Sequence, residues 1–252
     1  MSGHSKWSQI RRQKGVNDAR RGQLFTKLGR EIQVSSRSGG PDPDANFRLR
    51  LAIQKARESN MPADNIQRAI SRGAGTDEGA NFDEITYEGY GPGGVAIIVE
   101  AMTDNRNRTV AEVRNIFSRN GGNMGETGSV AWMFEPRGII SISANGHNPE
   151  DIELAAIDAG ATDVVVDGED VTVTTEPSDL DRVRRALAER FTIVDAENTI
   201  APTTTVELDG AKAAQVLKLV EKLEDLDDVQ RVHSNTDFSD EMLAEYDNIG
   251  AR

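Results

Sequence analysis

The chain has 252 residues, enough for two or three domains of ordinary size, and a formal net charge of −13. It contains no cysteine, which excludes disulfides, thiolate metal sites and cysteine nucleophiles. It lacks both an N-terminal apolar run of signal-peptide length and the run of about 18 apolar residues that a membrane span needs, so we expect a cytoplasmic protein outside the membrane.

The charge is unevenly distributed along the chain. Residues 1–73 carry 15 Lys and Arg against 6 Asp and Glu, a net of +9, whereas the remaining 179 residues carry 14 against 36, a net of −22. Clustered Lys and Arg neutralise phosphates and are the usual source of nucleic-acid affinity. The basic end is therefore predicted to bind nucleic acid, and the alternative is a solvated helical face without a partner.

The first regular element is predicted to be an amphipathic helix. Leu24, Leu28 and Ile32 recur at helical spacing and would bury one stripe, which leaves Lys27 and Arg30 on the solvent face. Residues 1–20 are too polar to join a core, so we expect an extended or mobile arm until a partner binds.

Two shorter helices are predicted to follow. The Gly- and Pro-rich residues 35–46 are expected to end the first helix. Asp44 or Asn46 would cap the next one, and Gly73 would stop the last one in a left-handed conformation. The expected helices are Phe47–Ser59 and Ala63–Ser71.

The remaining sequence alternates strands and helices. The order is strand, strand, helix, strand for Phe82–Tyr90, Val95–Met102, Arg106–Arg119 and Val130–Phe134. Residues 137–200 then give β-α-β-β-α-β, the ferredoxin-like order. The last part gives strand, helix, strand for Thr204–Leu208, Ala211–Leu223 and Val229–Ser234.

These elements predict an α+β protein of three domains. A basic helical domain with a flexible N-terminal arm occupies residues 1–80. Residues 81–136 and 201–240 together form a discontinuous α/β sandwich of ferredoxin-like type, interrupted by a complete ferredoxin-like domain at 137–200. Residues 241–252 form a polar tail.

Gly89–Gly94 matches the dinucleotide-binding pattern G-x-G-x-x-G. The phosphate-binding version must open a helix, whereas these glycines lead into a predicted strand. We therefore interpret the segment as a hairpin turn.

Catalytic and metal-binding patterns are missing from the sequence. His4, His147 and His233 have no neighbours at metal-ligand spacing, and neither a Walker motif nor a nucleophile elbow is present. The acidic stretch Glu221–Asp228 is interpreted as a solvated helix end and turn. We expect a non-enzymatic protein with no cofactor, no metal, no catalytic residue and no small-molecule substrate.

Binding chemistry remains. Cations suited to sequence-independent phosphate contacts lie on the arm and on the first helix: Lys6, Arg11, Arg12, Lys14, Arg20, Arg21, Lys27 and Arg30. Trp7 is predicted either to stack on an unpaired base or to fold back onto the helices. A second candidate surface comprises Asn105, Arg106, Arg108, Asn123 and Met124. For the neighbouring Gly121–Ser129 loop, simple turn geometry is the alternative.

Several motifs resemble those of the YebC/PmpR family. They are spread over all three predicted domains: His4–Trp7, Asp18–Gly22, Phe25–Leu28, Asn60–Pro62, Asp64–Ile66, Tyr87–Gly94 and Gly121–Val130. The resemblance covers residues 1 to about 240 and implies a helical domain and two α/β domains, with the third inserted in the second.

The resemblance also implies a cytoplasmic, non-enzymatic regulator of gene expression. Some family members are described as DNA-binding transcriptional regulators, and others act on the ribosome in translation, easing synthesis of stretches such as consecutive prolines. The implied nucleic-acid contacts are Lys6, Trp7, Arg11, Arg12, Lys14, Arg20, Arg21 and Lys27. The sequence offers no helix-turn-helix with a polar, base-reading second helix, so ribosomal RNA is favoured and duplex DNA is the alternative.

Overall fold

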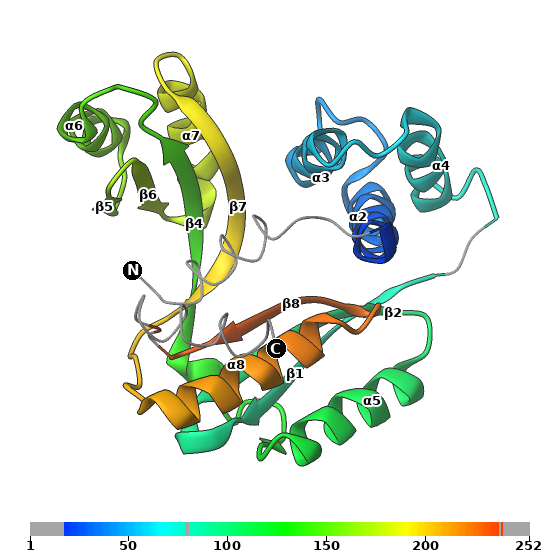
Figure 1. The fold of residues 1–252 in the computed structure, drawn as a ribbon. Coiled ribbons are helices and arrows are strands. Elements are labelled where there is room, and N and C mark those ends of the chain that lie inside the picture. Colours follow the sequence, from blue (N-terminus) through cyan, green and yellow to red (C-terminus); the bar gives the residue numbers. More distant parts are fainter. Residues whose placement is uncertain (1–17, 79–80, 237, 239–252) are drawn as a thin grey trace. The chain divides into compact units, whose positions relative to one another are not determined.

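The structure is a computed structural model that describes residues 18–78, 81–236 and 238 (Figure 1). The chain forms two compact units, one ending at Met133 and resuming at Pro202, the other comprising Phe134–Ala201. The predicted α+β class is confirmed: a helical N-terminal part precedes two separate four-stranded antiparallel sheets, and the second sheet interrupts the first in sequence. We retain the domain limits given above as proposed ones.

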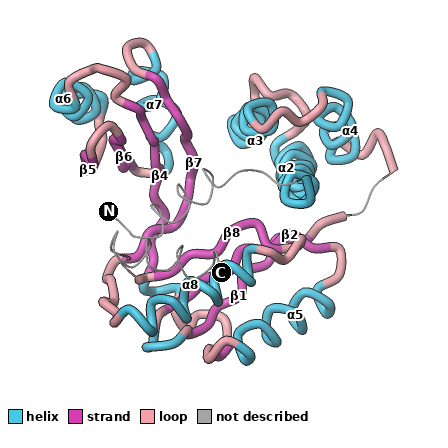
Figure 2. The backbone as a smooth tube through the Cα atoms, in the orientation of Figure 1, coloured by secondary structure: helices cyan, strands magenta, loops and turns pink. Residues whose placement is uncertain are grey.

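The helical part contains three described helices: α2 (Asp18–Gly39), α3 (Phe47–Glu58) and α4 (Ala63–Gly73). Figure 2 shows it built from helices and loops alone. Ile32 of α2 and Leu49 of α3 are completely buried in its core, and each contributes about 2 kcal/mol by removing apolar surface from water. Asn46 caps α3 by accepting a hydrogen bond from the Leu49 amide at 3.1 Å, which settles the choice between Asp44 and Asn46.

Two sequence expectations for this part are wrong. Helix α2 continues through Gly39, because tertiary contacts hold its last turns: Ser36 is buried and its hydroxyl donates to the Ile70 carbonyl at 2.9 Å. Gly73 is not left-handed, because it has no positive φ. The left-handed residue after α4 is Gly75, with a φ of 76°. Gly73 serves close packing instead, because a Cβ there would lie 2.2 Å from the Gln33 carbonyl oxygen.

The first sheet has the strand order β3-β1-β2-β8, and one face packs on two helices. Its elements are β1 (Asp83–Tyr90), β2 (Ala96–Thr103), α5 (Arg106–Arg119), β3 (Asn123–Met124), α8 (Gly210–Glu224) and β8 (Val229–Ser234). Ile97 and Val99 of β2 point at the helices, where Phe117 of α5 and Val216 of α8 complete a fully buried core.

The connection from β1 to β2 is the predicted turn. The strands pair antiparallel from Asp83 opposite Thr103 to Tyr90 opposite Ala96. A single 3-10 turn, Pro92–Gly94, joins them. The glycine motif therefore forms the turn of a hairpin and does not open an α-helix, as we predicted for this segment.

Two predicted strands of this sheet are wrong. Residues 131–133 form a 3-10 turn, and the third strand is the two-residue β3 just after α5. The predicted strand Thr204–Leu208 is reduced to a single bridge between Val206 and Thr236. Both regions are too short for a periodic hydrophobic signal to locate them.

The inserted unit has the strand order β5-β6-β4-β7 and the predicted β-α-β-β-α-β sequence, which confirms its ferredoxin-like type. Its elements are β4 (Phe134–Ser143), α6 (Pro149–Ala159), β5 (Asp163–Asp167), β6 (Asp170–Thr175), α7 (Leu180–Ala188) and β7 (Thr192–Pro202). Ile140 and Ile142 of β4 pair with Val173 and Val171 of β6, and all four side chains are buried.

Candidate nucleic-acid interface

Most of the predicted basic arm lies outside the described residues. This applies to Lys6, Trp7, Arg11, Arg12 and Lys14. The end of the predicted extended arm is helical, because α2 begins at Asp18 and includes Arg20. The expectation of an extended segment is therefore wrong for residues 18–20.

Arg21 is the first predicted contact residue whose side chain is described. It is exposed, and its guanidinium carbon lies 5.7 Å from the centre of the Phe25 ring, within the range of a cation–π contact. Within the described part of the chain, Arg21 has no ion-pair partner. Its charge is therefore accessible to a phosphate.

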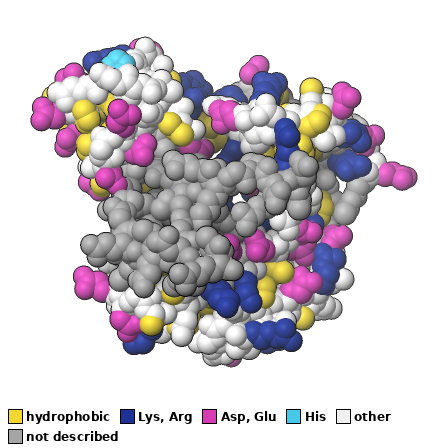
Figure 3. Space-filling view, viewed as in Figure 1, with side chains coloured by type: hydrophobic (Ala, Val, Ile, Leu, Met, Phe, Trp, Pro, Cys, Tyr) yellow, Lys and Arg dark blue, Asp and Glu magenta, His cyan; other side chains and the backbone are white. Residues whose placement is uncertain are grey.

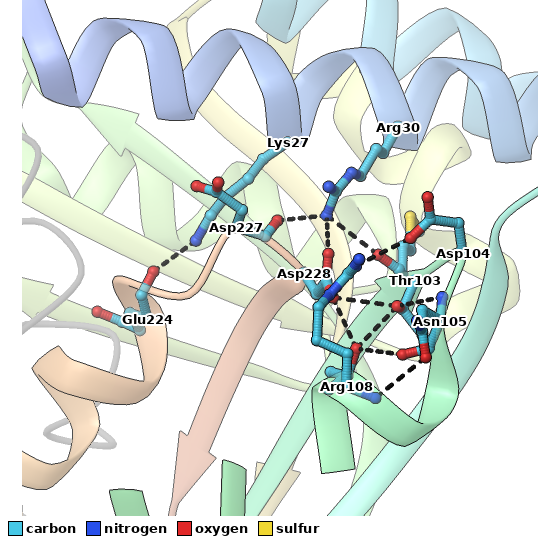
Figure 4. A network of polar contacts seen from close by, with 11 residues as sticks. Lys27, Arg30, Thr103, Asp104, Asn105, Arg108, Glu224, Asp227 and Asp228 are labelled. Atoms are coloured by element: carbon cyan, nitrogen blue, oxygen red, sulfur yellow. Dashed lines mark hydrogen bonds and ion pairs between the residues drawn. The ribbon is translucent and has the colours of Figure 1, made fainter. Parts of the chain in front are cut away.

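Lys27 and Arg30 do not lie on a solvent face, so that expectation is wrong. The Arg30 side chain is only 14% exposed, and its Nη1 donates to Asp228 Oδ1 at 2.7 Å and to the Asp227 carbonyl at 2.6 Å (Figure 4). The Lys27 ammonium donates to the Glu224 carbonyl at 2.5 Å. Periodicity predicts which residues share a helix face, but it does not predict that an acidic turn covers that face.

Asp228 is the centre of this network. Its carboxylate is 4% exposed and also accepts from Arg108 at 2.7 Å, from the Thr109 hydroxyl at 2.6 Å and from the Thr103 hydroxyl at 3.0 Å. Burial acts to raise the pKa of Asp228, but the three donors and the positive charge of Arg30 outweigh it and hold this pKa below its ordinary value. Asp228 is therefore an ionised, fully paired carboxylate.

The expectation that Glu221–Asp228 is simply a solvated helix end and turn is thus wrong at its last residue. The burial of Asp228 was not predicted, because this residue ends an acidic run and such runs are usually exposed. The available signal was its position directly before the buried strand β8, whose first residue, Val229, is completely buried.

The second candidate surface is not a single surface. Asn105 caps α5 by accepting from the Arg108 amide at 3.1 Å, and Arg106 forms a 2.8 Å ion pair with Asp83. Asn123 and Met124 form β3 beyond the opposite end of this 14-residue helix, whose length is about 20 Å. The structure therefore separates the two groups that the sequence placed together.

The Gly121–Ser129 loop is organised by a residue that the sequence analysis missed. The Glu88 carboxylate, in a residue only 4% exposed, accepts from the amides of Gly128 at 2.7 Å, Val130 at 2.8 Å and Ala131 at 2.8 Å. Burial acts to raise the pKa of Glu88, and these three amides more than offset it, so the pKa is lowered. The loop therefore turns around the Glu88 carboxylate, which binds its backbone amides.

Helices α3 and α4 are joined by only four residues, 59–62, and Asn60 within them has a positive φ of 59°. A short turn of this kind is typical of helix-turn-helix units. The outward side of α4 is polar, with Asp64, Gln67 and Arg68 all exposed. The predicted helices Phe47–Ser59 and Ala63–Ser71 already leave a short connection, but Asn-Met-Pro lacks the glycine that usually supplies the left-handed residue, so a helix-turn-helix was not predicted.

Charged groups of both signs are mixed on the face visible in Figure 3, with Lys and Arg interspersed among Asp and Glu.

Within the described ranges, no cluster of three or more His, Asp or Glu side chains is arranged to hold a metal ion. No described helix is long and apolar enough to cross a membrane.

Comparison with known proteins places the chain in a family. Residues 5–76 match the model of the TACO1/YebC protein N-terminal domain, and residues 82–236 match that of the TACO1/YebC second and third domain. The chain belongs to the TACO1/YebC family. The predicted resemblance to YebC is thereby confirmed.

Relatives in the TACO1/YebC family align along nearly their whole length. A protein of Chloroflexus aurantiacus is 57% identical over 98% of this chain and 100% of its own, and one of Herpetosiphon aurantiacus is 56% identical over 98% of each. Both are named probable transcriptional regulatory protein. The crystal structure of a conserved hypothetical protein from Aquifex aeolicus is 47% identical and superposes with a TM-score of 0.83 over 90% of this chain and 94% of that one.

Proposed function

We propose that this protein is a non-enzymatic, cytoplasmic regulator of gene expression that binds nucleic acid through its basic N-terminal part. The observation that carries the proposal is the net charge of +9 over residues 1–73 in a chain whose remainder carries −22. A positive end attracts phosphates, and an acidic remainder repels them, so binding is confined to one end. The name of these relatives, probable transcriptional regulatory protein, supports a role in regulation.

We further propose that ribosomal RNA is the target and that the protein eases synthesis of difficult stretches such as consecutive prolines. Its cations lie on an arm and along one helix, an arrangement suited to backbone contacts and single-stranded regions. Trp7 would stack on an unpaired base. The proposed contacts are Lys6, Trp7, Arg11, Arg12, Lys14, Arg20 and Arg21.

Duplex DNA is the second candidate, for which the α3–α4 connection supplies a specific observation. A helix that follows a four-residue turn can enter the major groove, and Gln67 and Arg68 are side chains that read adenine and guanine there. The name of the relatives, probable transcriptional regulatory protein, supports this candidate as well.

Sedimentation of the tagged full-length protein in sucrose gradients of cell lysate separates the two candidates. The ribosomal proposal predicts co-migration with ribosomes, lost at high salt and in a variant with Arg11 and Arg12 changed to Ala. The matched control changes Arg114 and Arg119, two exposed arginines of α5, and should leave co-migration intact. Absence from ribosomal fractions, with tighter binding to a promoter duplex than to random duplex, would favour DNA.

A further inference from the structure

Side chains on one face of α2 donate hydrogen bonds to the turn between α8 and β8. We call residues 224–228 the acidic turn, and Gln23, Lys27 and Arg30 the α2 stripe. The stripe residues recur at helical spacing, and each donates to a backbone carbonyl of the acidic turn: Gln23 to Asp225 at 3.2 Å, Lys27 to Glu224 at 2.5 Å and Arg30 to Asp227 at 2.6 Å.

The acidic turn presents to the α2 stripe the kind of acceptors that a phosphate would present. The carbonyls of Glu224 and Asp225 lie at the C-terminal end of α8, where the helix dipole is negative. Asp228 adds a full negative charge at 2.7 Å from the Arg30 guanidinium. Arginine and lysine bind carboxylates, carbonyls and phosphates with the same donors, so one acceptor excludes the other.

We propose that the acidic turn is an intramolecular competitor of nucleic acid for Lys27 and Arg30. In the closed state described here, these two cations are engaged by the turn, and contacts from the rest of the basic end supply the affinity. Release of α2 from the turn frees both cations and gives a tighter-binding open state. The inference rests on the proposed nucleic-acid-binding function and adds a means of regulating it.

The structure makes the acidic turn a point at which several parts of the fold can influence binding. Asp228 is shared between Arg30 of α2 and Arg108 of α5, so anything that moves α5 or the start of β8 alters the hold on α2. Apparent affinity is reduced by the fraction of molecules that are closed, so weakening the hold raises the affinity without adding a contact.

The first test measures the affinity of full-length variants for a fluorescent single-stranded RNA of about 20 nucleotides and for a duplex DNA of matching sequence. Asp228→Asn should tighten binding roughly three- to tenfold at low salt and steepen the salt dependence by about one released counterion. The control Asp158→Asn makes the same charge change at an exposed residue of α6 and should have a much smaller effect. Adding Arg30→Ala should cancel the gain.

A second variant is needed because Asp228 also accepts hydrogen bonds from Thr103 and Thr109, so Asp228→Asn could destabilise the fold. Asp227→Lys places a cation beside Arg30 and keeps the Asp228 carboxylate as the acceptor for Thr103 and Thr109. It should tighten binding more than Asp158→Lys, which adds the same charge elsewhere. Thermal unfolding of each variant checks that the fold is kept.

The cysteine-free chain also allows the closed state to be fixed. Gln23→Cys with Asp225→Cys, joined by a short thiol-reactive cross-linker, should bind both probes more weakly than the same variant before cross-linking. The inference is overturned if Asp228→Asn and Asp227→Lys match their controls while Arg11→Ala with Arg12→Ala still weakens binding. If the wild type binds neither probe, the proposed function itself fails.

Discussion

The two sheets have the same number of strands and each packs on two helices, yet they accommodate charge differently. The sheet with order β3-β1-β2-β8 is associated with two buried carboxylates, Glu88 and Asp228, each 4% exposed and each bound by at least three donors. The inserted unit, residues 134–201, buries no Asp, Glu, Lys or Arg. Its ion pairs are partly or largely exposed, as between Arg185 and Asp181 of α7.

This difference indicates which unit uses charge to join distant parts of the chain. Asp228 connects to Arg30, which is 198 residues away, and to Arg108, which is 120 residues away. The surface pairs of α7 connect residues three or four positions apart on one helix. Removing one partner of a buried pair leaves an uncompensated charge and is therefore costly, whereas an exposed pair contributes little to stability.

The largest expected effect is that of Asp228→Ala. Because Arg30 loses its only carboxylate partner among the described residues while remaining largely buried, we expect the free energy of unfolding to fall by about 3–5 kcal/mol. Urea denaturation monitored by circular dichroism measures it. A loss below about 1 kcal/mol, as for a surface pair, would remove the contrast between the two units.

Glu88→Ala should have an intermediate effect. It leaves the amides of Gly128, Val130 and Ala131 without their acceptor, which costs about 1–3 kcal/mol. Hydrogen exchange of residues 121–131 locates the change, and we expect faster exchange there than in the inserted unit. Unchanged exchange in this loop would show that Glu88 does not organise it.

The two carboxylates also predict a pH dependence. The pKa values of Glu88 and Asp228 are lowered in the folded protein, so their stabilisation is fully present above the unfolded-state values of about 4. It is lost as the pH falls through the folded-state values. Stability measured from pH 6 down to pH 2 should fall less steeply for Asp228→Asn than for the wild type, and an equal slope would contradict the assignment.

The smallest expected effect belongs to the inserted unit. Arg185→Ala removes a pair whose arginine side chain is 63% exposed, so the free energy of unfolding should change by less than about 0.5 kcal/mol. Urea denaturation under the same conditions supplies the comparison. A loss as large as that of Asp228→Ala would mean that burial is not what distinguishes the units.

Sequence patterns predicted the elements whose causes are local. The glycine hairpin after β1 and the β-α-β-β-α-β order follow from patterns of neighbouring side chains, and Asn46 was one of two predicted candidates for the α3 cap. The last turns of α2 were not predictable in this way, because they depend on contacts of Ser36 with Ile70 and of Gln33 with Gly73.

The candidate site was predictable only in its charge. Counting Lys and Arg identifies the basic end, and helical spacing places Lys27 and Arg30 near one another on α2. That the acidic turn engages both is a tertiary contact between residues about 200 positions apart, for which periodicity carries no signal. Asp228 and Glu88 were missed for the same reason, since acidic side chains are rarely buried without partners that only the fold supplies.

The most direct test of the central claim is the salt dependence of nucleic-acid affinity, measured by fluorescence anisotropy with the full-length protein. The wild type should bind a single-stranded RNA more weakly as salt rises, and Arg11→Ala with Arg12→Ala should reduce the slope by about one to two counterions. Arg114→Ala with Arg119→Ala, which removes the same charge from α5, should leave the slope unchanged. Equal slopes for all three proteins, or equal losses in both variants, would contradict a nucleic-acid interface at the basic N-terminal end.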